Sequence, residues 1–197
     1  MTQSGDQIEN PVTGQRMVFR RTSAETGGEV SENDGFFVAG GFAGPQHVHP
    51  IQDERFEVIS GEAGFIVRGE KKVLGHGETL DVPRGVRHTF WNEGPDELHV
   101  RAWFHPGTPS TERFYEVFFR LGREGPVDRH GMPNLFLIAL LAPEFADHVR
   151  LASPPWWVQR AVFALLRPVA RLLGYQRRAE QLLRTGSTAP ARIGGSL

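Results

Sequence analysis

Cysteine is absent from this chain of 197 residues. Disulfide bonds, thiolate metal sites and cysteine nucleophiles are therefore excluded, and any metal site must use nitrogen and oxygen ligands. Long apolar runs are lacking too: segment 134–142 is too short to span a bilayer, and segment 156–173 contains three arginines and a proline. The first ten residues, MTQSGDQIEN, are polar and show no signal-peptide pattern, which predicts a cytoplasmic protein.

Acidic residues are scarce in the C-terminal part of the chain. Residues 148–192 hold eight of the 22 Lys and Arg residues but one of the 23 Asp and Glu residues, although the net charge of the chain is −1. A segment of this kind can contact anionic lipid or an acidic partner, or pack on the acidic remainder of its own chain. We expect packing within the chain, and contact of a basic C-terminal helix with a membrane surface is the less favoured alternative. We expect no nucleic-acid binding, because no helix-turn-helix pattern precedes or follows the β-rich region of residues 17–105.

Short β-like runs separated by Gly, Pro and Asn extend from Met17 to about His105. They predict an all-β barrel or jelly roll preceded by a flexible lead-in over residues 1–15. The strands are expected near 17–22, 36–42, 45–50, 54–60, 64–69, 72–75, 79–82, 86–92 and 98–105.

The pattern becomes helical after Pro109. Helices are expected over 111–121, ended by Gly122, and over 133–141, 143–149 and 155–184, with Pro168 kinking or splitting the last. The chain is therefore divided into a flexible N-terminus (1–15), a β-barrel (16–108), an α-helical extension (109–185) and a disordered tail (186–197).

Two spaced motifs inside the β region carry the chemistry. They read Gly41-x5-His47-x-His49-x4-Glu54-x6-Gly61 and Gly77-x5-Pro83-x-Gly85-x2-His88-x3-Asn92. His47 and His49 are two residues apart and share one face of an extended strand, and Glu54 can return to the same place after a bend. Three imidazoles and one carboxylate suit a first-row transition metal that keeps positions open for substrate, although a single His-x-His pair in a strand is more often a surface or core feature.

These motifs resemble, position for position, the two motifs of the cupin superfamily, over about residues 35–105. The resemblance implies a mainly β fold, the double-stranded β-helix or jelly-roll barrel, followed here by the α-helical extension. It also implies that His47, His49, Glu54 and His88 bind one divalent transition metal. Fe(II) or Mn(II) is favoured, and Ni, Cu, Co or Zn are the alternatives. Cupin barrels commonly pair through their edge strands, which implies a homodimer.

The resemblance implies a range of reactions on a small-molecule substrate. We expect a metal-dependent oxidoreductase of the dioxygenase type that acts on a small, oxygen-bearing organic molecule. The alternatives are a metal-dependent isomerase or cyclase, in which the metal acts as a Lewis acid, and a non-enzymatic small-molecule-binding module.

Candidate catalytic residues outside the ligand set are His99 and Arg101, which share one face of the predicted strand 98–105. If that face lines the barrel, Arg101 can bind a substrate carboxylate and His99 can transfer a proton; if it faces out, both are solvated charges. Aromatic side chains that could line the pocket and exclude water are Phe56, Phe65, Phe90 and Trp103.

Overall fold

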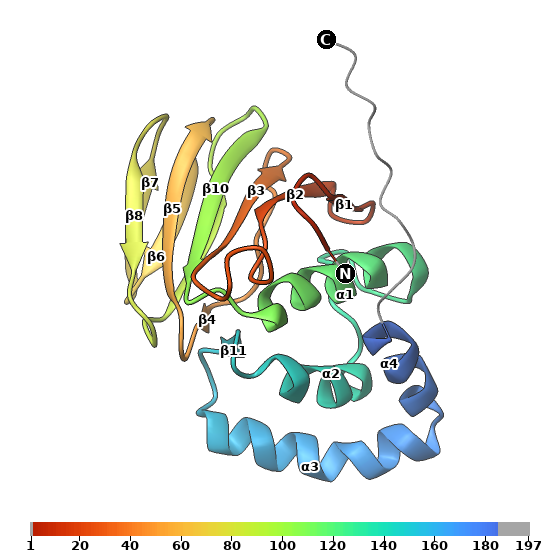
Figure 1. The fold of residues 1–197 in the computed structure, drawn as a ribbon. Helices are drawn as coiled ribbons and strands as arrows, with labels where there is room; N and C mark the ends of the chain where they lie inside the picture. Colours follow the sequence, from red (N-terminus) through yellow and green to blue (C-terminus); the bar gives the residue numbers. More distant parts are fainter. Residues whose placement is uncertain (1, 185–197) are drawn as a thin grey trace.

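The computed structural model describes residues 2–184, and two antiparallel sheets face each other within it (Figure 1). The six-stranded sheet has the order β1-β2-β3-β10-β5-β8, and the five-stranded sheet has the order β11-β4-β9-β6-β7. Helices gather on one side of the two sheets (Figure 1). The mainly β jelly-roll fold with a helical extension is therefore confirmed, and the tail 186–197 lies outside the described residues.

The strands are β1 (Gln7–Asn10), β2 (Gln15–Arg21), β3 (Ser31–Phe37), β4 (His47–Val48), β5 (Asp53–Ser60), β6 (Ala63–Val67), β7 (Glu70–Leu74), β8 (Thr79–Val82), β9 (His88–Asn92), β10 (Leu98–His105) and β11 (Arg150–Leu151). The predicted strands agree with β2 and with β4 to β10 to within a few residues.

Two regions differ from the sequence prediction. The run predicted at 36–42 is shifted, because β3 is the polar segment Ser31–Phe37 and residues 38–41 form a loop. Residues 7–10, expected in the flexible lead-in, form β1, and Ile8 packs with Met17, Phe19 and Phe119 of helix α1 (Pro109–Glu124). Both differences arise from partners distant in the sequence, which local polarity does not reveal.

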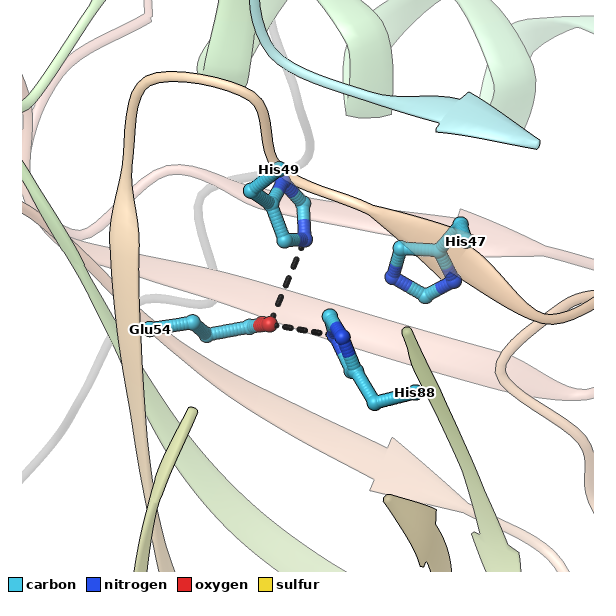
Figure 2. A group of neighbouring side chains, drawn as sticks. All are labelled: His47, His49, Glu54 and His88. Atoms are coloured by element: carbon cyan, nitrogen blue, oxygen red, sulfur yellow. Dashed lines mark hydrogen bonds and ion pairs between the residues drawn. The ribbon is translucent and has the colours of Figure 1, made fainter. Parts of the chain in front are cut away.

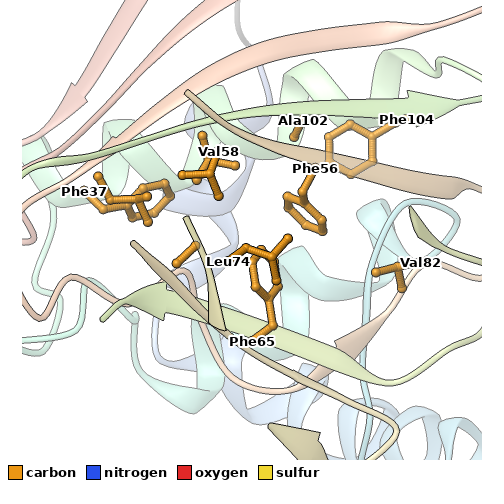
Figure 3. Close-up of a cluster of buried hydrophobic side chains, with 11 residues drawn as sticks. Phe37, Phe56, Val58, Phe65, Leu74, Val82, Ala102 and Phe104 are labelled. Atoms are coloured by element: carbon orange, nitrogen blue, oxygen red, sulfur yellow. The ribbon is translucent and has the colours of Figure 1, made fainter. Parts of the chain in front are cut away.

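The interior of the barrel follows the two-residue period of its strands. Along β10 the buried side chains are Leu98, Val100, Ala102 and Phe104, while the residues between them are partly exposed. Aromatic rings from both sheets meet in the interior, where Phe56 lies 5.1 Å from Phe65 between ring centroids (Figure 3). This apolar interior supports the strand ends that carry the polar site.

The helical elements are α1 (Pro109–Glu124), α2 (Leu135–Leu141), the 3-10 helix η1 (Ala142–Phe145), α3 (Trp156–Leu172) and α4 (Tyr175–Leu183). They enclose a second apolar cluster, which includes Val117, Leu121, Leu141, Phe145 and Leu182. Among residues 2–184, no helix combines the length and apolar character needed to cross a membrane.

Helix boundaries differ from the predicted ones at two glycines. Helix α1 continues past Gly122, where a Cβ atom would collide with the Asn10 side chain, so this glycine permits close packing of α1 on β1. Helix α3 runs through Pro168 and ends at Leu172, and the chain turns at Gly174 with φ +84°. That left-handed conformation suits glycine, which explains why the break lies there.

The extension is attached to the barrel through polar contacts as well as apolar ones. The buried Glu112 carboxyl group of α1 accepts hydrogen bonds from the Ser23 amide (2.6 Å), the Ser23 hydroxyl (3.1 Å) and the Ser31 hydroxyl (2.8 Å). Strand β11 pairs with β4, so the extension also supplies the edge of the five-stranded sheet. The predicted helix 143–149 is therefore replaced by the short η1 and the approach to β11.

Candidate metal centre

Four side chains predicted as ligands converge inside the barrel (Figure 2). One candidate ligand atom from each of His47, His49, Glu54 and His88 lies within 4.8 Å of the other three. His49, Glu54 and His88 are 4%, 5% and 0% exposed, and His47 is partly buried. The structure therefore brings together the complete set expected from the two motifs.

The two sheets contribute different members of this cluster. His47 lies on β4 directly opposite His88 on β9, and His49 follows two residues after His47. Glu54 is the second residue of β5 in the other sheet, and its side chain points inward like those of Phe56 and Val58. The site thus spans the space between the sheets.

The backbone fixes which nitrogen of each imidazole faces the centre. The Nδ1 atoms of His47, His49 and His88 lie 2.9, 2.6 and 2.9 Å from the carbonyl oxygens of Pro45, His148 and Val86. A carbonyl only accepts, so each Nδ1 carries a proton and donates it. The Nε2 atoms are then the ones available as ligands, which is the arrangement expected around a protein-bound metal.

Glu54 lies between two of these rings. Its Oε2 is 2.8 Å from His88 Nε2 and 3.2 Å from His49 Nε2. The buried His49 Nε2 nevertheless has no hydrogen-bond partner among the described residues. A buried polar atom without a partner is costly, and a cation bound by these nitrogens and the carboxylate would satisfy it. The residues therefore fit a divalent metal.

The electrostatics of the cluster favour an ionised Glu54, a neutral His47 and a His88 that is protonated more readily than a free imidazole. Burial opposes ionisation of Glu54, but His49 and His88 outweigh it and hold its pKa below the usual value. Burial, reinforced by His88 and His49, lowers the pKa of His47 to about 3. Burial also disfavours a charged His88, but its hydrogen bond to Glu54 prevails and raises the His88 pKa.

A second layer of polar residues comes partly from the extension and was not identified from the sequence. The His148 backbone carbonyl orients His49, and the two rings lie 4.8 Å apart between centroids. The buried His148 Nδ1 donates to Gln52 Oε1 at 2.7 Å, while Gln52 Nε2 donates to the Thr111 hydroxyl at 3.0 Å. Burial lowers the pKa of His148 well below its ordinary value. His148 has no regular spacing from the two motifs in the sequence. Only its position in the fold shows that it contacts His49.

The cluster opens into a cavity of about 220 Å³ between the barrel and the extension. Its lining includes Phe56 and Phe90 from the barrel, and Phe114, Tyr115 and Phe163 from helices. No hydrogen bond joins the Tyr115 hydroxyl to residues 2–184, and burial raises the pKa of this hydroxyl. The cavity is thus largely apolar near the cluster, where the polar side chains of its lining include His47, His49, Glu54, His148 and the neutral phenol of Tyr115.

The candidates on β10 lie elsewhere. His99, Arg101 and Trp103 alternate with the buried residues of this strand and point away from the interior. Arg101 Nε is 2.7 Å from Asp34 Oδ1, in an ion-pair network on the outer face of the sheet. His99 and Arg101 therefore do not contact the cluster, and Trp103 does not line the cavity. Phe65 belongs to the barrel interior.

Comparisons with known proteins agree with the motifs. Residues 36–104 match the family described as Cupin domain. Germin-like protein 3-8 from Oryza sativa subsp. japonica is 40% identical over 77 residues, which cover 36% of this chain and 34% of that protein. Oxidoreductase iacF from Pestalotiopsis fici is 37% identical over 73 residues, which cover 35% of this chain and 36% of that protein.

A further similarity extends beyond the barrel. A protein named oxidoreductase from Arthrobotrys oligospora is 29% identical over 147 residues, covering 67% of this chain and 56% of that protein. This chain spans about a third of the length of the two relatives above and about half of this one. The facing sheets, the buried His/Glu cluster and the family match together place the chain in the cupin superfamily, with its cupin domain over residues 36–104.

Proposed function

We propose that this protein is a metal-dependent oxidoreductase of the dioxygenase type, with a small organic substrate and O₂ as the oxidant. The observation that carries the proposal is the inward-facing cluster of His47, His49, Glu54 and His88 beside a largely apolar cavity. Two similar proteins carry the name oxidoreductase, which supports the reaction class without identifying a substrate.

The four ligands would hold one divalent ion, with Fe(II) or Mn(II) favoured and Ni, Cu, Co or Zn as alternatives. Such an ion supplies Lewis acidity and, for iron or manganese, a one-electron redox couple. The chain's own residues position that chemistry: the carbonyls of Pro45, Val86 and His148 hold the three imidazoles with Nε2 inward. Glu54 adds the negative charge that partly neutralises the ion.

The cavity wall selects the substrate. Phenylalanines from the barrel and the helices favour an apolar or aromatic body and keep water out. Tyr115 lines the same cavity, and no hydrogen bond joins its hydroxyl to the described residues. We infer that this hydroxyl donates a hydrogen bond to an oxygen of the substrate. At about 220 Å³ the cavity suits a small molecule.

The same phenol favours a second candidate, a metal-dependent isomerase or cyclase. Such an enzyme needs Lewis acidity and a proton donor but no O₂, and a neutral Tyr115 beside the cluster provides the donor. A non-enzymatic small-molecule-binding module is the third. Oxygen dependence separates the first two, and binding without turnover identifies the third.

Metal analysis of the purified protein, followed by oxygen-consumption assays on a panel of small phenols, keto acids and hydroxy acids, tests the proposal. We expect about one equivalent of a transition metal in the wild type and in the control His99→Ala, whose ring lies on the outer face. His49→Ala and Glu54→Ala should lose it. A folded wild-type protein that takes up no transition metal would overturn the proposal. Turnover in the absence of O₂ would overturn the dioxygenase assignment and support the metal-dependent isomerase or cyclase instead.

A further inference from the structure

Helix α3 runs along the outer side of the helical extension (Figure 1). Several of its apolar side chains are exposed. The exposed α3 face consists of Trp157, Val162, Leu165, Val169 and Leu172, which are 74%, 39%, 76%, 42% and 88% exposed. At 3.6 residues per turn these side chains lie within about 140° of the helix circumference. Leu173, directly after the helix, is 58% exposed and extends the face.

The opposite side of α3 is already occupied. Gln159, Phe163 and Ala170 are buried, Ala170 packs in the helical core, and Gln159 donates to the carbonyls of Leu151 and Pro154. Helix α3 therefore packs on the rest of the protein through one side, and the exposed α3 face is a separate apolar side that points into solvent. A contiguous apolar surface of this kind marks a contact with another apolar medium or molecule.

The charged residues of α3 itself are all arginines. Arg160, Arg167 and Arg171 lie along one edge of the exposed α3 face, and α3 contains no Asp or Glu. None of the three has a carboxylate partner within residues 2–184: Arg167 and Arg171 contact the Ala139 carbonyl and the Gln176 amide oxygen at 3.3 Å. The sequence pattern predicts that the basic segment packs on the acidic barrel, but no ion pair joins these three arginines to a carboxylate of residues 2–184.

We propose that the exposed α3 face docks on the surface of a bilayer that contains anionic phospholipid. Leucine, valine and tryptophan side chains would enter the headgroup region, and the arginine row would contact lipid phosphates. The helix lies on the membrane and does not cross it, in agreement with its composition. The proposal does not depend on which reaction the barrel performs.

A second copy of the chain fits this surface less well. A two-fold antiparallel pair of α3 helices would bury the apolar residues, but it would place both arginine rows along the same side of the interface. No acidic residue of α3 is available to neutralise them. An anionic bilayer supplies both an apolar interior and the opposite charge.

Docking would bring the membrane close to the cavity. Trp156, Gln159 and Phe163 of α3 line the cavity, while Trp157 and Leu165 point outward from the same helix. One helix, about 10 Å across, would then separate the lipid headgroups from the cavity. This position suits an enzyme whose substrate partitions between water and lipid.

Vesicle co-flotation tests the proposal with the full-length protein. We expect flotation with vesicles of phosphatidylcholine and phosphatidylglycerol, less with phosphatidylcholine alone, and a decrease with added salt. The double variant Leu165→Asp/Leu172→Asp should lower partitioning by more than about tenfold, because two apolar contacts are replaced by charges. Replacing Arg160 and Arg171 with Gln should lower it by about fivefold for each arginine, on anionic vesicles only.

Matched controls lie on the barrel. Val73→Asp replaces a side chain that is 50% exposed on β7, and Arg55→Gln removes an exposed cation of β5, so neither should alter flotation. The α3 residues replaced are exposed, so circular dichroism melting should match the wild type. Absence of flotation with anionic vesicles, or flotation that the leucine variant retains, would overturn the proposal. A dimer in light scattering that the leucine variant abolishes, without vesicle binding, would assign the face to a second copy and also overturn it.

Discussion

The attachment of the extension to the barrel through Glu112 leads to a quantitative prediction. Replacing this residue with alanine removes the carboxyl group that accepts from the Ser23 amide and from the hydroxyls of Ser23 and Ser31. Glu112, Ser23 and Ser31 are 6%, 5% and 2% exposed, so solvent does not readily replace the lost acceptor. The perturbation is therefore confined to one buried contact between α1 and the barrel.

The expected loss follows from the number of donors. A buried donor without an acceptor costs about 1–3 kcal/mol. The two hydroxyls can rotate toward other acceptors, but the Ser23 amide cannot. We therefore expect Glu112→Ala to lower the free energy of unfolding by about 3–5 kcal/mol, below the sum of three full penalties. Glu112→Gln keeps one acceptor oxygen and should lose roughly half as much.

Urea unfolding followed by circular dichroism measures both variants. Glu144→Ala is the matched control, because Glu144 is exposed on η1 and should change stability by less than about 0.5 kcal/mol. A loss below about 1 kcal/mol for Glu112→Ala, with an unchanged denaturant slope, would refute the conclusion that this contact joins the extension to the barrel.

Three further predictions concern the site and the barrel. A metal ion must displace the proton on His88 Nε2, which lies 2.8 Å from Glu54 Oε2. This contact raises the His88 pKa above its ordinary value of 6.5. Metal affinity should therefore increase as the pH rises through the raised His88 pKa, and it should weaken at pH values below that pKa. Chelator competition across pH measures this, and a flat profile would contradict it. His99→Ala should bind metal with wild-type affinity in calorimetry, whereas a tenfold loss would mean that the outer face acts on the site. Phe65→Ala should cost about 3–5 kcal/mol in urea unfolding, because the ring is fully buried against Phe56, and a loss below 1 kcal/mol would argue against that packing.

Most of the site could be predicted because the spacing of its residues within short segments of the chain already indicates which side chains share a strand face. His47 and His49 share a strand face through their two-residue spacing, and the glycines and prolines around them indicate turns. The position of Glu54 depends on the opposite sheet, so its approach to His88 at 2.8 Å came from the family resemblance and not from spacing. The sequence left open which face of strand 98–105 carries His99 and Arg101, and only the position of β10 between β3 and β5 decided that both side chains point outward.

The helical region was predicted less accurately for a physical reason. Proline and glycine signal breaks locally, yet Pro168 lies inside α3 and Gly122 inside α1, while the turn falls at Gly174. Packing of α1 on Asn10 and of α3 on the helical core decides which of these signals is used. Tertiary contacts therefore override the local preference.

The sequence by itself predicted the barrel and restricted any metal site to nitrogen and oxygen donors, because strand periodicity and the absence of cysteine are local properties. The resemblance of its two motifs to a known family predicted the set of four candidate ligands. Only the tertiary structure decided that His148 and Tyr115 from the extension join the site, and that α3 turns an apolar, arginine-bordered face outward. These features depend on contacts between segments far apart in the chain. An amphipathic pattern shows that a helix has an apolar side, but only packing shows whether that side is covered.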